Sequence, residues 1–263
     1  MIEVSQLHKS FSQQQVLCGV NLKIDRGESV VIIGGSGCGK SVLLRHIIGG
    51  SGCGKSVLLR HIIGLVQPDE GDVKIDGQSI ADLSERELIK VRRKFGMLFQ
   101  GSALFDSLTV EENVGFLLNR EQKMSPAAIR ETVADALELV DLGGTQVKKP
   151  AELSGGMKKR VGLARAIVYK PEIILYDEPT TGLDPVVADS IDQLVIRMRD
   201  QLKCTSIVVT HDTRSMRRVG NRVMLLHHGE IHANGTPDEI FNSTDPIVHK
   251  FVNGIADPKD LEF

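Results

Sequence analysis

A segment of fifteen residues occurs twice in immediate succession, and each copy contains a phosphate-binding motif. Residues 32–46 read IIGGSGCGKSVLLRH, and residues 47–61 repeat them letter for letter. Each copy carries the pattern G-x-x-x-x-G-K-[ST], in which backbone N–H groups of a glycine-rich turn point at phosphate oxygens, the lysine reaches the outer phosphates and the hydroxyl ligates Mg²⁺. The chain therefore has two candidate P-loops where one such domain has room for a single P-loop.

The two candidate P-loops are identical in every position. The first consists of Gly34, Gly35, Ser36, Gly37, Cys38, Gly39, Lys40 and Ser41, and the second runs from Gly49 through Gly54 and Lys55 to Ser56.

Size and charge limit what such a chain can do. With 263 residues, 41% of them hydrophobic, it can bury the core of one large or two modest domains. The net charge of −2 provides no basic field for nucleic acid, and we expect the bases Lys158, Lys159 and Arg160 to lie on a solvated helix face. The charge therefore disfavours nucleic acid as a partner. The N-terminus has no signal-peptide pattern and no apolar run has the length of a membrane span, which favours a cytoplasmic protein.

The order of apolar segments predicts an α/β fold. Short strand-like runs alternate with helical stretches, as in a parallel sheet, at 30–33, 173–176, 206–210 and 223–227. Val73 to Ile75, followed by Asp76-Gly77, is typical of a hairpin strand in a small antiparallel element. Residues 125–140 have helical spacing behind a Ser-Pro start and belong to a predicted helical subdomain at about 101–165.

Two further motifs follow the P-loops. The run Ile173 to Tyr176 ends in Asp177 and Glu178, which places an acid at the carboxyl end of a buried strand, where it can hold the Mg²⁺ shell, and a second acid where it can polarise water. Residues 153–157 read LSGGM, and Ser154 can cap the helix that follows. Taken alone, the first motif could be a surface acidic pair and the second an ordinary helix cap; their order behind a P-loop is far more specific.

These motifs together resemble the ATP-binding subunits of ABC transporters over nearly the whole chain. The strings LFQGSALFDSLTVEENVGF and LSGGMKKRVGLARAI are most similar to the MlaF-like ATPases of phospholipid and organic-solvent-tolerance transport systems. The resemblance implies a P-loop NTPase core within residues 1–245, a C-terminal tail at 246–263, and ATP and Mg²⁺ as cofactors. One departure is Met157, which stands where the family usually has glutamine.

The resemblance also assigns roles to single residues. Phe11 matches the aromatic that stacks on adenine, Gln100 the Q-loop, Asp184 the D-loop and His211 the switch histidine. Ser154, Gly155 and Gly156 match the signature that contacts the nucleotide of a second copy. The catalytic set would then be Glu178, His211 and Gln100, with Ser41, Gln100 and Asp177 around the metal.

A subunit of this family works in an assembly. The resemblance implies a head-to-tail dimer of two copies around ATP and a membrane permease docked near residues 100–106. It also implies a tail that contacts either the second ATPase or a small accessory protein. The leading function is ATP hydrolysis that energises phospholipid transport at the cytoplasmic face of the inner membrane. The alternatives are an assembly-competent subunit whose ATPase activity the duplication impairs, and a soluble ABC ATPase acting on DNA or ribosomes.

The sequence also favours one P-loop over the other. The first P-loop directly follows the apolar strand 29–33, and its helix can end at Gly49-Gly50, so we expect this P-loop to bind ATP through Lys40. Residues 57–63 should then form an added bulge that leaves apolar side chains in water and lowers stability. Use of the second copy would require residues 44–48 to replace the central strand or the first copy to bulge out of the site.

Overall fold

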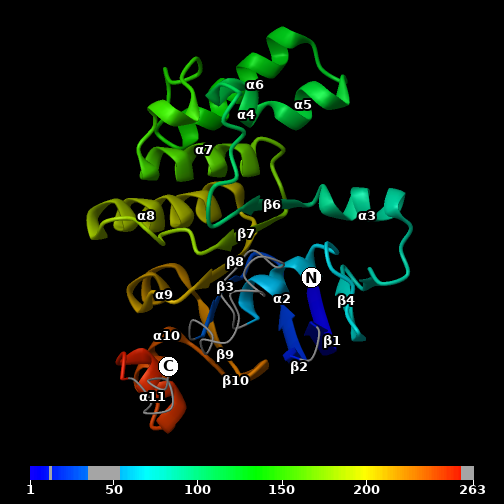
Figure 1. Ribbon diagram of the computed structural model, residues 1–263, viewed down its shortest axis with the longest axis vertical. Coiled ribbons are helices and arrows are strands. Elements are labelled where there is room, and N and C mark those ends of the chain that lie inside the picture. The colour runs from blue at the N-terminus through cyan, green and yellow to red at the C-terminus, as the bar shows by residue number, and fades with distance from the viewer. Residues whose placement is uncertain (12–13, 35–53, 256–263) are drawn as a thin grey trace. The chain divides into compact units, whose positions relative to one another are not determined.

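The computed structural model describes residues 1–11, 14–34 and 54–255 of the chain (Figure 1). The described residues fall into two compact units, one formed by residues 1–92 and 205–263 and the other by residues 93–204. The first P-loop, apart from Gly34, and the end of the predicted tail lie outside the described residues.

The first unit holds two sheets. Its strands are β1 Ile2–Phe11, β2 Gln14–Ile24, β3 Ser29–Ile33, β4 Glu70–Ile75, β5 Gln78–Ser79, β8 Thr205–Thr210, β9 Arg222–His227 and β10 Glu230–Gly235. Its helices are α2 Lys55–Ile62, α3 Glu85–Arg92, α9 Thr213–Val219, α10 Pro237–Phe241 and α11 Pro246–Val252. The predicted tail thus contains α11.

The antiparallel sheet of this unit has the strand order β2-β1-β4-β5. The turn between β4 and β5 consists of Asp76 and Gly77, both with left-handed φ angles of 52° and 81°. This is the combination that a tight two-residue hairpin requires. The predicted hairpin strand at Val73 to Ile75 is therefore confirmed, with Ile75 opposite Gln78.

The second sheet places β3 between two parallel neighbours, β8 and β9, while β10 pairs antiparallel with β9. All five residues of β3, SVVII, are buried. A parallel strand covered on both faces favours such a run, in which four β-branched residues follow a serine. The predicted strands at 30–33, 206–210 and 223–227 are confirmed.

The second unit contains the predicted helical subdomain and two parallel strands. Its elements are β6 Phe95–Leu98, α4 Val110–Val114, α5 Phe116–Glu121, α6 Pro126–Leu139, the 3₁₀ turn η1 Pro150–Glu152, α7 Gly155–Ile167, β7 Ile173–Asp177 and α8 Pro185–Leu202. In Figure 1, α4, α5 and α6 gather on one side of α7. The helix predicted at 125–140 is confirmed as α6, which Ser125 caps by accepting a hydrogen bond from the Ala128 N–H.

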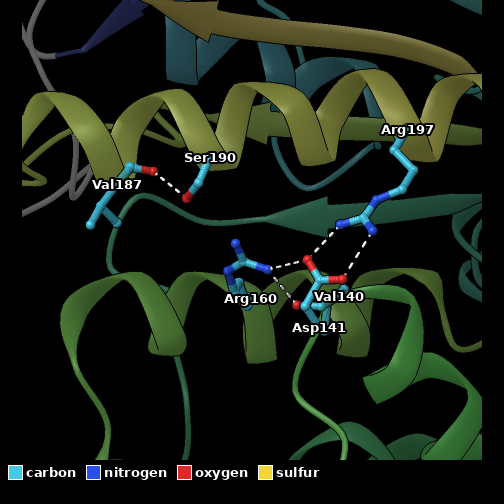
Figure 2. A network of polar contacts seen from close by, with 6 residues as sticks. All are labelled: Val140, Asp141, Arg160, Val187, Ser190 and Arg197. Carbon is cyan, nitrogen blue, oxygen red and sulfur yellow. Dashed lines mark hydrogen bonds and ion pairs between the residues drawn. The ribbon is translucent and has the colours of Figure 1, made fainter.

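An ion-pair network joins three helices of the second unit (Figure 2). Asp141, just after α6, accepts two hydrogen bonds from the Arg197 guanidinium on α8, at 2.9 and 2.6 Å, and one from Arg160 on α7, at 2.7 Å. Arg160 also donates to the Val140 carbonyl. The two guanidinium groups, Arg197 foremost, lower the pKa of Asp141 to about 2, so the carboxylate stays charged at neutral pH.

In the part of the chain that the structure describes, no helix is both long and apolar enough to span a bilayer.

Candidate functional site

Among the described residues, the first helix after the central strand comes from the second copy of the repeated segment. β3 ends at Ile33, and α2 begins at Lys55, behind Gly54. The Lys55 side chain is fully buried, and its Nζ donates a hydrogen bond of 2.6 Å to the Gly34 carbonyl. A glycine of the first copy and the lysine of the second copy therefore lie together at the end of β3.

Gly54 fits the conformation that a P-loop needs at this point. Its φ of +83° is left-handed, and a Cβ there would lie 2.9 Å from the Val16 carbonyl oxygen. The N-cap residue of α2 is Gly54, which has no side chain to cap the helix, so the start of α2 carries only the backbone at this point. Such a helix start, with a lysine beside it, has the chemistry of an anion-binding site.

The expectation that residues 57–63 form a bulge in water is wrong. Val57 to Ile62 belong to α2, and the apolar side chains among residues 57–63 are all buried. The physical reason is that only one of two identical segments can fill this place in the core, and the second copy fills it with the same contacts that the first would have made.

One of the two objections to the use of Lys55 does not hold. β3 keeps Ser29–Ile33, so residues 44–48 do not replace the central strand. The first-copy residues Gly35 to Ser41, and Gly49, lie outside the described residues.

The predicted acidic pair lies at the end of a buried strand. Asp177 is the last residue of β7 and Glu178 follows it; their exposed fractions are 4% and 1%. Glu178 has a left-handed φ of 50°, and its carboxylate accepts a hydrogen bond of 2.9 Å from the Thr181 hydroxyl. Two acids buried this deeply need polar partners or a cation.

Sequence reasoning missed the cation beside these acids. Lys159 was expected on a solvated helix face, but its side chain is buried on α7 and its Nζ donates hydrogen bonds to the backbone carbonyls of Gln100 and Glu178. The signal was present in the spacing, because Gly156, Lys159 and Leu163 recur at helical intervals and all lie on the buried side of α7.

The signature segment starts α7. Ser154 caps the helix, its hydroxyl accepting a hydrogen bond of 3.3 Å from the Met157 N–H. A Cβ added to Gly156 would lie 2.5 Å from a methyl group of Val187, so a side chain does not fit there. Packing therefore requires glycine at position 156, apart from the nucleotide contact that the resemblance assigns to it. At Gly155 the restriction is weaker, because an added Cβ would lie 3.3 Å from a methyl group of Leu183.

The remaining predicted residues lie at the ends of elements. Phe11 ends β1, with the Lys9 ammonium 5.5 Å from its ring centroid. Asp184 caps α8 by accepting hydrogen bonds of 3.0 Å from the N–H groups of Val186 and Val187. His211 directly follows β8 and is exposed, and Gln100 lies two residues after β6.

Comparison with known proteins decides the family. Residues 17–50 and 45–181 match the family described as ABC transporter, and the two matched segments overlap inside the repeated region. This chain belongs to that family. The predictions of a P-loop NTPase fold and of an ABC-family ATPase are confirmed.

Relatives and solved structures agree with this assignment. The chain is 40% identical to the Arabidopsis thaliana chloroplastic protein TRIGALACTOSYLDIACYLGLYCEROL 3, over 98% of this chain and 74% of the relative. It is 36% identical to the intermembrane phospholipid transport system ATP-binding protein MlaF of Haemophilus influenzae, over 98% and 92%. A dimeric ATP-binding cassette in a post-hydrolysis state, bound to ADP and Pi, superposes with a TM-score of 0.77 at 34% identity, over 90% of this chain and 99% of that one.

Proposed function

We propose that this chain is the ATP-hydrolysing subunit of a phospholipid transporter and that Lys55, rather than Lys40, holds the nucleotide phosphates. The observation that carries the proposal is the buried Lys55 ammonium at the start of α2, directly beyond the central strand. In this proposal the α2 N–H groups and Lys55 bind the phosphates, and Gly54 allows the backbone to come close to them.

Mg²⁺ fits the chemistry of the residues that the motifs assign to it. Ser56, the residue after Lys55, is buried with 2% of its surface exposed, and Asp177 is a buried carboxylate. A hydroxyl and a carboxylate oxygen are ligands that Mg²⁺ prefers. Ser56 would therefore replace Ser41 in the predicted metal set, with Asp177 and Gln100 unchanged, and the ion would neutralise charge on the phosphates.

The hydrolytic roles stay with the residues named by the resemblance. Glu178 would orient and polarise the attacking water, His211 would stabilise the phosphate, and Phe11 would stack on adenine. Ser154, Gly155, Gly156 and Asp184 would act across the interface between two copies of the chain. The dimeric solved relative supports such a pairing.

Phospholipid is the cargo class that the relatives support most directly. The MlaF relative is named for intermembrane phospholipid transport and is similar over nearly all of both chains. Other relatives carry other names, among them a methionine import protein of Carboxydothermus hydrogenoformans at 43% identity. The subunit would act at the cytoplasmic face of the membrane, bound to a permease. A small accessory protein would bind its C-terminal tail.

The test compares Lys55→Ala with Lys40→Ala in the full chain. We expect Lys55→Ala to abolish ATP binding and hydrolysis and Lys40→Ala to leave both near the parental level. Loss with Lys40→Ala alone would reverse the assignment. A parental chain without activity, together with an active variant that lacks residues 35–49, would instead favour the assembly-competent but ATPase-impaired subunit.

A further inference from the structure

A buried lysine connects the two loops that carry the proposed catalytic residues of the second unit. Lys159 lies on α7 with 5% of its surface exposed. Lysine is rarely buried this far, because removing an ammonium group from water costs several kcal/mol unless partners compensate. The partners of Lys159 therefore indicate why the cation is there.

Both hydrogen-bond partners are backbone carbonyls. The Nζ atom donates to the carbonyl oxygen of Gln100 and, at 3.1 Å, to that of Glu178. Burial lowers the pKa of Lys159, and the negative charges of Asp177 and Glu178 oppose this effect. The ammonium thus makes contacts that replacement of the Gln100 or Glu178 side chains would leave in place.

These two carbonyls follow neighbouring strands. β6 and β7 are parallel, with Leu98 opposite Tyr176, so the residues just beyond their carboxyl ends are close in space. Gln100 lies two residues beyond Leu98, and Glu178 follows β7 directly. One ammonium group on α7 thereby fixes the separation of the two loops.

We propose that Lys159 is a positioning residue that couples the Gln100 loop to Glu178. The inference rests on the proposed function of these two residues. A shift of the Gln100 loop would move Glu178 through the shared ammonium, and the backbone of Glu178, left-handed at φ 50°, would hold its carboxylate toward Thr181 only while that carbonyl is fixed. The hydrogen bonds of Lys159 to described residues involve none of the residues proposed to hold the phosphates.

The test uses Lys159→Met in the full chain, with Lys158→Met as its control. Methionine is similar in length and apolar, so it can fill the same buried space without the hydrogen bonds. Lys158 is the adjacent lysine on the same helix, half-buried, and no polar contact of its side chain is recorded among the described residues. If Lys159→Met does not fold, Lys159→Gln, whose shorter amide cannot bridge both carbonyls, takes its place.

Two measurements decide the matter. We expect Lys159→Met to lower kcat by about tenfold or more while KM for ATP stays within about twofold of the parental value, and Lys158→Met to change neither. Hydrogen exchange should become faster in residues 99–103 and 178–181 of Lys159→Met only. An unchanged kcat, or a kcat and an ATP affinity that fall together, would overturn the proposal.

The exchange measurement also separates this inference from the proposed function. If the parental chain hydrolyses no ATP, the proposed function fails, yet faster exchange in both loops of Lys159→Met would still establish the connection. Unchanged exchange in both loops would refute the connection whatever the parental activity is.

Discussion

Replacement of Asp141 by asparagine should destabilise the second unit without disturbing its backbone. Asp141 has a left-handed φ of 56°, a conformation that asparagine tolerates and that most other residues do not. The substitution therefore removes the charge that Arg160 and Arg197 share in Figure 2 while adding no backbone strain.

The magnitude follows from the pKa of Asp141. A fall from 3.8 to about 2 corresponds to at most about 2.4 kcal/mol of stability at neutral pH. Since 51% of the Asp141 side chain is exposed, solvent screening reduces this contribution to about 1–1.5 kcal/mol. The value stays above that of an ordinary surface ion pair because the contact with Arg197 is bidentate. The melting temperature should fall by about 2–6 °C.

The pH dependence supplies the sign of the effect. Because folding lowers the pKa of Asp141, its contribution is complete above pH 3.8 and is lost as the pH falls toward 2. The difference in unfolding free energy between parent and Asp141→Asn, measured by denaturant titration, should therefore be constant from pH 7 to 5 and shrink below pH 4. Asp200→Asn is the control, because Asp200 is exposed and pairs only with its sequence neighbour Arg199 among the ion pairs of the described residues. A pH-independent difference, or a loss no larger than that of Asp200→Asn, would refute the reasoning.

Three further outcomes are expected. Gly156→Ala should cost about 1–3 kcal/mol in thermal unfolding, because its methyl group would lie 2.5 Å from Val187, whereas Gly101→Ala, which meets open space, should cost less than half as much. Tyr169→Phe should leave stability unchanged or raise it by up to about 1 kcal/mol in denaturant titration, since the buried hydroxyl has no hydrogen-bond partner among the described residues; a clear loss would reveal a partner. Deletion of residues 35–49 should raise the melting temperature and preserve ATP binding, since one copy of the segment suffices to fill the place of α2 in the core; an equal or lower melting temperature would contradict this.

Much of the fold was predictable because its signals are local. The run SVVII of β3, the Ser125 cap of α6 and the Asp76-Gly77 turn each specify their own conformation through burial, capping or backbone preference. The acidic pair at the end of β7 was equally predictable, because Asp177 and Glu178 directly follow an uninterrupted apolar run of strand length.

The rest could not be read locally. Two identical segments have the same propensity to form α2, so local sequence cannot choose between Lys40 and Lys55, and the choice depends on the whole connection from β3 to α2. Lys159 was predicted wrongly for a different reason. Three consecutive bases are typical of a solvated helix face, but the carbonyls of Gln100 and Glu178, which are distant in sequence, compensate for the burial of Lys159.

In the proposed role of Glu178 as the residue that polarises the attacking water, its left-handed backbone limits which substitutions can trap the ATPase with nucleotide bound but uncleaved. Valine or isoleucine would force a branched side chain into a conformation that it rarely adopts, and a failure to turn over would then report a distorted loop. Glycine would relax the loop and remove the carboxylate at once. Glutamine keeps the shape, the reach and the hydrogen bond from Thr181 while it removes only the charge. It is therefore the replacement whose arrested state can be attributed to chemistry alone.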